Sequence, residues 1–313
     1  MALTYNTLNS VTREEVIRDV TDNIFNATPV LKWLRSNQVT GKSGTKLQVP
    51  VSYARNTNAG SYSGADNFLA NSIETATKAE FNWKDYYVSV VFTGDEKDQN
   101  KGKNAVVDVI DHKLENARMT MTYQLTTGLF SAGTGNSNKD LTGLLAAVDD
   151  GTGTATYGGI ERLTDATWWK AKKTALSDYI SLAAMQSMYG DLTDGEIRPD
   201  MIVTTQDVWD DLWEIITPIQ RSDSEKMSAN YGFRAITFNG TPVVVDAQCT
   251  AGYMYFLNSK FLKLYPMSGY ENVKWTGWKE PVAQDVGVGQ FLWKGQLACS
   301  NCRYQGRIDT ITT

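Results

Sequence analysis

Apolar residues recur every three or four positions over residues 103–131, and this spacing predicts a long amphipathic helix. The members of the stripe are Val106, Ile110, Leu114, Ala117, Met121, Leu125 and Leu129. Charged residues occupy the opposite face, and neither proline nor glycine interrupts the run before Gly128. At about 1.5 Å of rise per residue, this helix is roughly 40 Å long and well above the usual mean of about 11–12 residues.

Alternating apolar positions predict two strands that frame a long polar stretch. One face of the first strand carries Leu47, Val49, Val51 and Tyr53, and one face of the second carries Tyr86, Val88, Val90 and Phe92. Pro50 lacks a backbone donor, so we expect the first strand at a sheet edge. Residues 56–64 are rich in turn formers. The pattern predicts a long two-stranded excursion, which is marginal alone and must fold onto its own domain or be held by another chain.

The start of the sequence predicts a short helix that Thr12 can cap. Val16, Ile17, Val20 and Ile24 form one apolar stripe along it. A stripe this short must lie against something else, either the body of the chain or a neighbouring subunit.

The second half of the sequence predicts alternating helices and strands. Helical spacing covers about 165–189, with a possible restart at Ser177, and about 206–216, capped near Thr205. The expected strands are 201–204, 238–246, 253–257 and 262–265, with closing strands between 297 and 311. The sequence has no internal repeat and no low-complexity linker. We predict an α+β fold.

Composition narrows the classes of function. The chain has 313 residues, a formal net charge of −5, 42% hydrophobic residues and a single histidine. Mild acidity argues against a dedicated nucleic-acid binder. Because imidazole is the usual general base near neutral pH and the commonest metal ligand, one histidine disfavours much hydrolase and metalloenzyme chemistry.

The cysteines and the first residues indicate where the chain is made. Cys249, Cys299 and Cys302 are too few and too uneven for a disulfide scaffold, so we expect folding in a reducing cytoplasm. No basic segment followed by an apolar core opens the sequence, so no signal peptide is expected. No stretch approaches the ~20 apolar residues that cross a bilayer, so no membrane association is expected.

Short motifs suggest chemistry but lack the context that the chemistry needs. Gly41, Lys42 and Ser43 resemble a phosphate loop, yet position 36 is Ser36 and an edge strand follows instead of a helix. The glycine-rich stretches 132–138 and 151–159 are interpreted as surface turns. Cys299 and Cys302 have no second pair to complete a four-ligand zinc site, so we interpret them as ordinary reduced cysteines.

Clusters of polar side chains do not assemble into a catalytic site either. His112 lies near carboxylates on the long helix, but without a second histidine a solvated helix face is the better interpretation. The acidic residues Asp207, Asp210, Asp211 and Glu214 alternate with Trp209 and Trp213 at helical spacing, which is typical of an amphipathic surface helix. We therefore predict no catalytic, cofactor-binding or metal-binding residue, and no enzyme.

One family combines an amino-terminal arm, a long weakly anchored hairpin, a long helix and an α/β second half. The segments that carry the likeness are 44–51, 83–93, 103–131, 199–205 with Trp209 and Leu212, 238–246, 255–258 and 303–309. In this layout the chain resembles the major capsid protein of tailed bacteriophages, with the Hong Kong 97-type fold that encapsulins share.

The resemblance implies a domain plan. It gives an amino-terminal arm over 1–39, an extended β-hairpin loop over 40–93 and a peripheral domain over 94–163 with a spine helix at about 103–131. An α/β axial domain follows over 164–295, and 296–313 returns to the peripheral domain as its last strand.

The resemblance also implies a structural function. Many copies would form pentamers and hexamers of an icosahedral virion shell around double-stranded DNA, bound without sequence specificity, after synthesis in the bacterial host. A scaffolding protein encoded separately, a portal and decoration proteins are possible partners, and we expect non-covalent contacts between subunits. An encapsulin-like compartment shell, or a soluble α/β hydrolase or binding module, are the alternatives.

The candidate contact residues between subunits lie in the two extensions. They are Lys42, Lys46, Arg55, Tyr62 and Phe68 in the hairpin, and Val16, Val20 and Ile24 in the arm. Residues 41–60 hold three basic residues and no acidic one. This local charge predicts that the hairpin meets an acidic surface, such as the charged face of another subunit's long helix.

Overall fold

The computed structural model describes residues 28–40, 43–99, 105–220, 236–281 and 284–313. Helices are α2 (Pro29–Ser36), α3 (Gly94–Gln99), α4 (Ala105–Phe130), α5 (Gly135–Asn138), α6 (Leu144–Ala147), α7 (Leu182–Leu192) and α8 (Gln206–Gln220), with short 3-10 turns η1 (Thr167–Trp169) and η2 (Cys302–Tyr304). Strands are β1 (Lys46–Ser52), β2 (Ala76–Asn82), β3 (Lys84–Thr93), β4 (Thr156–Tyr157), β5 (Ile160–Glu161), β6 (Lys172–Ala175), β7 (Met201–Thr204), β8 (Ile236–Phe238), β9 (Thr241–Val245), β10 (Met254–Leu257), β11 (Leu262–Pro266), β12 (Lys274–Trp275), β13 (Val286–Cys299) and β14 (Gly306–Asp309).

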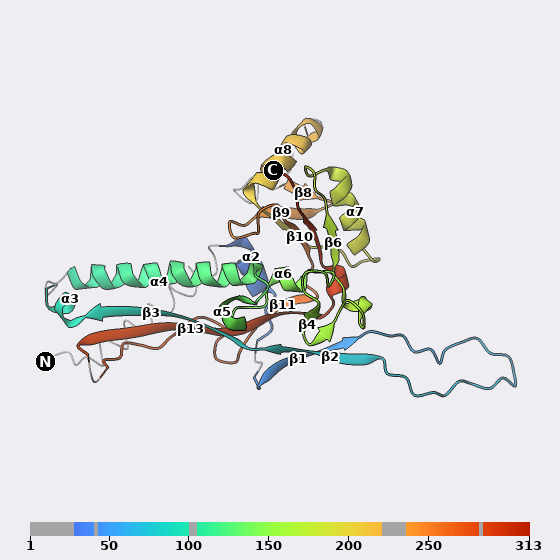
Figure 1. Cartoon of the computed structure of the whole chain (residues 1–313), viewed down its shortest axis with the longest axis horizontal. Coiled ribbons are helices and arrows are strands. Elements are labelled where there is room, and N and C mark those ends of the chain that lie inside the picture. Colours follow the sequence, from blue (N-terminus) through green and yellow to red (C-terminus); the bar gives the residue numbers. More distant parts are fainter. Residues whose placement is uncertain (1–27, 41–42, 100–104, 221–235, 282–283) are drawn as a thin grey trace.

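A long antiparallel ribbon of β3 and β13 forms the base of the first unit, which we call the peripheral unit. The ribbon pairs Thr93 with Val286 at one end and Lys84 with Gly295 at the other, and β11 and β12 pair with β13. Helix α4 lies along this ribbon (Figure 1). It confirms the long helix predicted at 103–131, and five members of the predicted stripe are buried: Leu114, Ala117, Met121, Leu125 and Leu129.

A mixed sheet in the order β6-β14-β10-β7-β9-β8 forms the second unit, which we call the axial unit. Helices α7 and α8 lie beside this sheet, away from the long ribbon (Figure 1). Strand β7 is buried at every position, which explains its three consecutive apolar residues Met201, Ile202 and Val203. The predicted turn and strand at 238–246 are present, with Asn239 and Gly240 in the left-handed conformation between β8 and β9.

The two-stranded excursion is present, but its second strand was predicted in the wrong place. Strand β1 pairs antiparallel with β2, so that Leu47 faces Phe81, whereas the alternating set from Tyr86 to Phe92 belongs to β3 and pairs with β13. Strand β2 is hard to detect because only Ala79 and Phe81 of its side chains are buried. The polar loop 53–75 continues beyond the pair and extends away from the body (Figure 1).

The helix predicted over 165–189 is wrong in its first half. That stretch forms η1 and then β6, which pairs in parallel with β14. The helix α7 begins only after Ser181, whose hydroxyl accepts a hydrogen bond from the backbone N–H of Ala184 at 3.2 Å. Pairing with a distant strand thus overrides the local helical spacing.

The predicted domain boundaries also need correction. Residues 303–309 were expected as the last strand of the peripheral domain, but β14 lies inside the axial sheet, and β13 instead belongs to the peripheral sheet. Strand β13 is inconspicuous in the sequence because glycines replace apolar residues in it. A Cβ added at Gly289 would lie 2.1 Å from the ring of Trp275, so the strand needs glycine where the tryptophan packs.

We expect Gly289→Ala to lower the free energy of unfolding by about 1–3 kcal/mol, because the added methyl group overlaps the Trp275 ring. Gly190→Ala is the matched control. Nothing lies within 4 Å of a Cβ at Gly190, which is in α7, so this change should be neutral or stabilise by up to about 1 kcal/mol. Urea unfolding followed by tryptophan fluorescence measures both, and equal stability of the two variants would contradict the packing argument.

The predicted arm over 1–39 is divided by the structure. Helix α2 is part of the body, because Val30, Leu31 and Leu34 are buried in the main core. The predicted contact residues Val16, Val20 and Ile24, together with Lys42, lie outside the described residues. Within the part of the chain that is described, no helix is both long and apolar enough to span a membrane.

Candidate inter-subunit surfaces

Three large apolar side chains are exposed in the loop beyond the hairpin. Tyr62, Phe68 and Leu69 are 66%, 71% and 67% exposed. A turn between Ser63 and Asp66 brings Tyr62 and Phe68 together, since the Ser63 N–H donates to the Asp66 carboxylate at 2.8 Å. The two rings then meet edge to face, with centroids 5.0 Å apart. We call Tyr62, Phe68 and Leu69 the loop tip.

The base of the hairpin, unlike the loop tip, is anchored to its own chain. Phe81 packs edge to face against Tyr157 at 5.0 Å, and Tyr53 stacks on Trp168 at 5.1 Å. The base of the hairpin is therefore fixed against the body of the chain, while the loop tip at its far end is exposed. This geometry suits a segment that reaches another molecule.

The predicted basic character of the hairpin is partly neutralised within the hairpin. The Lys46 ammonium lies 3.2 Å and the Lys78 ammonium 2.8 Å from carboxylate oxygens of Glu80, and these two cations lower the pKa of Glu80. Arg55 is exposed. An acidic surface opposite Lys42, Lys46 and Arg55 stays a prediction.

We expect the combined change Lys42→Glu, Lys46→Glu and Arg55→Glu to impair association between copies of the chain while the subunit stays folded. Exposed ion pairs contribute only about 0–1 kcal/mol to stability, so the fold should tolerate the change. The charge swap Lys46→Glu with Glu80→Lys is the control, because it keeps the pair within the hairpin. Unchanged assemblies of the triple variant by electron microscopy would contradict an acidic partner surface.

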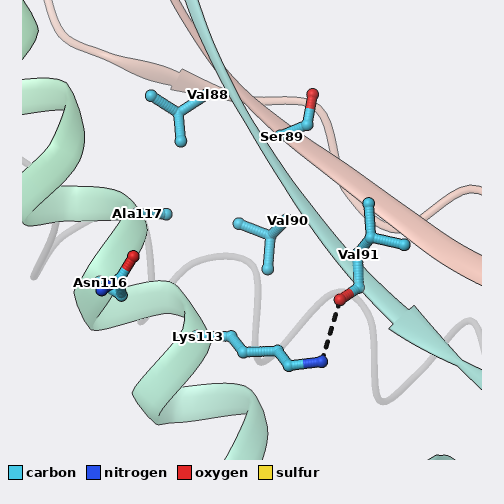
Figure 2. A pocket seen from close by; sticks show the side chains of 7 residues that line it. All are labelled: Val88, Ser89, Val90, Val91, Lys113, Asn116 and Ala117. Atoms are coloured by element: carbon cyan, nitrogen blue, oxygen red, sulfur yellow. Dashed lines mark hydrogen bonds between the residues drawn. The ribbon is translucent and has the colours of Figure 1, made fainter.

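The outer face of the β3–β13 ribbon is a second apolar surface. Val88 and Val90 lie on the face of β3 toward α4, while Val91 points away (Figure 2). Because side chains alternate along β3, Phe92 shares the face of Val90 and Tyr87 shares the face of Val91. Tyr87 is 71% exposed and Val91 is 44% exposed. Their partners across the ribbon are apolar too, since Tyr87 pairs with Leu292 and Val91 with Val288. We call these four residues the ribbon patch.

A third apolar surface lies on the outer side of α4. Met119 and Tyr123 are four residues apart and therefore neighbours on one face of the helix. They are 63% and 54% exposed, whereas Ala117 and Met121 face the core. We call Met119 and Tyr123 the helix stripe. Both residues lie in the helix that the sequence predicted, but only the structure shows that no described part of the chain covers their side chains.

A pocket of about 280 Å³ opens between α4 and β3 (Figure 2). It is lined by Val88, Ser89, Val90, Val91, Lys113, Asn116 and Ala117. The Lys113 ammonium donates to the Val91 carbonyl at 3.1 Å and to the Glu96 carboxylate at 2.6 Å, and it lowers the pKa of Glu96. With its one cation already paired and its other side chains mostly apolar, the pocket suits an inserted side chain better than a charged ligand.

The structure describes part of the motifs that were considered for catalysis. The side chain of His112 lies outside the described residues, and no group of three or more metal-ligating side chains occurs within the described part of the chain. Asp207 and Asp210 are exposed on α8, where Trp209 and Trp213 stack at 5.5 Å. The thiols of Cys299 and Cys302 are free and buried.

A buried charge network joins the two units, and sequence reasoning missed it. The Asp149 carboxylate accepts hydrogen bonds from the N–H groups of Gly151, Gly153 and Thr154, and it pairs with Arg307 of β14 at 2.8 Å. Asp149 and Arg307 are both buried. Charged residues are seldom fully buried, so nothing in their sequence pattern predicts this position.

Comparison with known proteins identifies the architecture. No family model and no curated protein matches the sequence. Among solved structures, the capsid asymmetric unit of cyanophage A-1(L) is similar over 91% of this chain and 93% of its own, with a TM-score of 0.68 and 17% identity. The chain has the Hong Kong 97-type capsid fold. This confirms the fold predicted from the layout.

The same fold occurs in shells of different kinds. The capsid of the native GTA particle matches with a TM-score of 0.60 and 12% identity, over 89% of this chain and 90% of that one. The SrpI encapsulin of Synechococcus elongatus PCC 7942 matches with a TM-score of 0.57 and 10% identity, over 90% and 87%. At these identities the likeness establishes the Hong Kong 97-type fold alone.

Proposed function

We propose that the chain is the major capsid protein of a tailed bacteriophage, a structural subunit without catalytic activity. Many copies assemble through pentamers and hexamers into an icosahedral shell. The observation that carries the proposal is an exposed apolar loop tip at the end of an anchored hairpin, in a chain with a capsid fold. An isolated subunit leaves this surface in water, whereas a neighbouring copy buries it.

The exposed apolar surfaces supply both sides of the contact between copies. The loop tip offers two aromatic rings and a leucine, while the ribbon patch and the helix stripe offer a tyrosine each. Interfaces between subunits that never separate are large and apolar at their centre, and aromatic residues are enriched there. The loop tip docks on one of these two surfaces of the next subunit.

A phage head is preferred over an encapsulin compartment. The cyanophage capsid has the higher TM-score, 0.68 against 0.57 for the encapsulin, and it matches at 17% identity against 10%. The mild negative charge of −5 suits an inner surface that holds DNA loosely and without sequence specificity. Scaffolding, portal and decoration proteins, and synthesis in a bacterial cytoplasm, belong to the same proposal.

Two measurements test the proposal and separate its alternatives. Light scattering of the purified protein should show particles far larger than one 34.7 kDa chain. Particles from infected or producing cells, treated with nuclease, should retain double-stranded DNA. Particles that hold protein cargo and no DNA would support the encapsulin alternative. A monodisperse monomer at all concentrations, alone and with the other proteins of its own particle, would contradict any shell function.

A further inference from the structure

Arg162 is a buried cation whose charge no described carboxylate balances directly. It is 0% exposed, and its guanidinium donates to the carbonyls of Ala146 at 2.9 Å, Asp149 at 3.0 Å and Ala147 at 3.2 Å. The Asp149 carboxylate is bonded to Arg307 instead. A guanidinium stays protonated in proteins, and burying it without an anion is costly. The site therefore favours any neighbour that can become an anion.

Cys302 is that neighbour. Its Sγ lies 3.5 Å from Nη2 of Arg162, and the cysteine is fully buried. Burial alone raises the pKa of a thiol, but hydrogen bonds from Cys299 and Arg162 and the charge of Arg162 outweigh it and lower the pKa of Cys302. For Cys299, burial and the hydrogen bond with Cys302 raise the pKa well above its usual value.

The surroundings of the two sulfur atoms hold this arrangement in place. The backbone N–H of Cys299 donates to the Tyr157 hydroxyl at 3.2 Å, and the Arg162 guanidinium lies over the Tyr157 ring at 4.5 Å. The other titratable group near Cys299 is Tyr265. Burial raises the pKa of both tyrosines, so neither phenol ionises near neutral pH. Cys302 is thus the one group of this cluster that can supply the negative charge.

The pair lies where the chain passes from one unit to the other. Cys299 is the last residue of β13 in the peripheral sheet, and Cys302 is the first residue of η2, which leads into β14 of the axial sheet. A disulfide bond between them would therefore constrain the short segment that connects the two sheets.

We propose that Cys302 is a buried thiolate paired with Arg162, and that it makes Cys299 and Cys302 a peroxide-sensitive disulfide pair at the crossing between the two sheets. The Cys302 thiolate attacks one oxygen of a small peroxide, which forms a sulfenic acid and releases hydroxide. The Cys299 thiol loses its proton and displaces this hydroxyl group from sulfur, so that a disulfide forms and water leaves. The two sulfur atoms lose two electrons together, and the peroxide is reduced.

The first test measures the thiolate in the full-length protein. Ionisation of a thiol adds an ultraviolet absorption band at longer wavelength than that of the thiol, so we follow this band in the wild type, Cys302→Ser and Cys249→Ser from about pH 5 to about pH 9. Cys249 is the matched control, because it is also buried but lacks a cation and burial raises its pKa to about 12. We expect one thiolate at pH 7 in the wild type and in Cys249→Ser, and none in Cys302→Ser. A wild type without thiolate at pH 7 would overturn the proposal.

The second test measures the disulfide. Protein treated with hydrogen peroxide, then alkylated in denaturant and digested, should yield a peptide in which Cys299 and Cys302 are bridged and unalkylated, while Cys249 is alkylated.

The Arg162 variants test the role of the cation. Arg162→Gln should lose the Cys302 thiolate and react with peroxide at least tenfold more slowly than the wild type. Arg162→Lys keeps the charge and should recover part of both. If Arg162→Gln does not fold, the bridged peptide in the wild type and in Cys249→Ser still tests whether the pair forms. Oxidation of Cys249 as fast as Cys302, or no bridge, would refute the pair. Neither result depends on whether the protein forms shells.

Discussion

Replacing both Tyr62 and Phe68 with serine is expected to abolish shell formation and leave a folded subunit. The two rings are 66% and 71% exposed and pack against each other, so the fold loses almost nothing. In a shell, each ring buried against a neighbour contributes about 1.5–3 kcal/mol, and every subunit repeats the contact. Sedimentation should show free subunits or small rings at concentrations where the wild type forms complete shells.

Asn67→Ser is the control for this double variant, because it changes an exposed polar residue of the same loop. It should assemble like the wild type. Normal shells from the double variant, with an unchanged melting temperature, would show that the loop tip takes no part in assembly.

The surface that receives the loop tip can be identified by combining variants. Tyr87→Ser alters the ribbon patch and Tyr123→Ser alters the helix stripe, and both side chains are more than half exposed. Each is combined with Phe68→Ser. Groups in direct contact give non-additive losses of assembly free energy, whereas distant groups add. The substitution whose effect is not additive with Phe68→Ser therefore identifies the surface on which the loop tip docks.

Asp149→Ala is expected to cost about 3–5 kcal/mol in the free energy of unfolding, the largest effect on stability that we predict. The change removes the nearer of two carboxylates that pair with the buried Arg307 and leaves it only Asp309, at 3.5 Å. It also removes the acceptor of three backbone N–H groups in the loop that ends at Thr154. Asp149 joins Arg307 of the axial sheet to the loop that ends at Thr154. Loss of this carboxylate should therefore also weaken the contact between the two units. Urea unfolding measures the effect.

Asp85→Ala is the matched control for the buried pair. The Asp85 carboxylate lies 3.2 Å from Lys294, but its side chain is 62% exposed, so the change should cost about 0–1 kcal/mol. Equal losses in the two variants would mean that burial of the Asp149 network adds nothing.

Elements with one buried face were predictable from the sequence. The stripe through Leu114, Met121 and Leu125 defines α4 because one side of the helix packs on the ribbon along its described length. Leu47, Val49 and Val51 define β1 for the same reason. In both cases the period of burial follows the geometry of the element, so the sequence carries it directly.

Elements set by distant partners were not predictable. Strand β13 contains Gly289 because Trp275 occupies the space of a side chain, and this removes the apolar signal of the strand. Strand β6 forms because β14 pairs with it from more than a hundred residues away. Their local sequences do not reveal these partners.

The surroundings of the candidate contact residues were predictable only in part, and their role in contacts between subunits stays a prediction. Tyr62 and Phe68 are exposed aromatic residues in a polar stretch, so their positions were informative without a structure. The pairing of Lys46 with Glu80 depends on the register of β1 against β2, which the sequence did not reveal. The buried charges Asp149 and Arg162 could not be recognised, because charged residues are normally exposed.

Electron cryomicroscopy of the purified protein tests the central claim most directly. We predict closed icosahedral shells built of pentamers and hexamers, in which the loop tip of each subunit lies on the ribbon patch or the helix stripe of its neighbour. Protein that is folded but forms neither shells nor rings at any concentration, alone or with the other proteins of its own particle, would contradict the account.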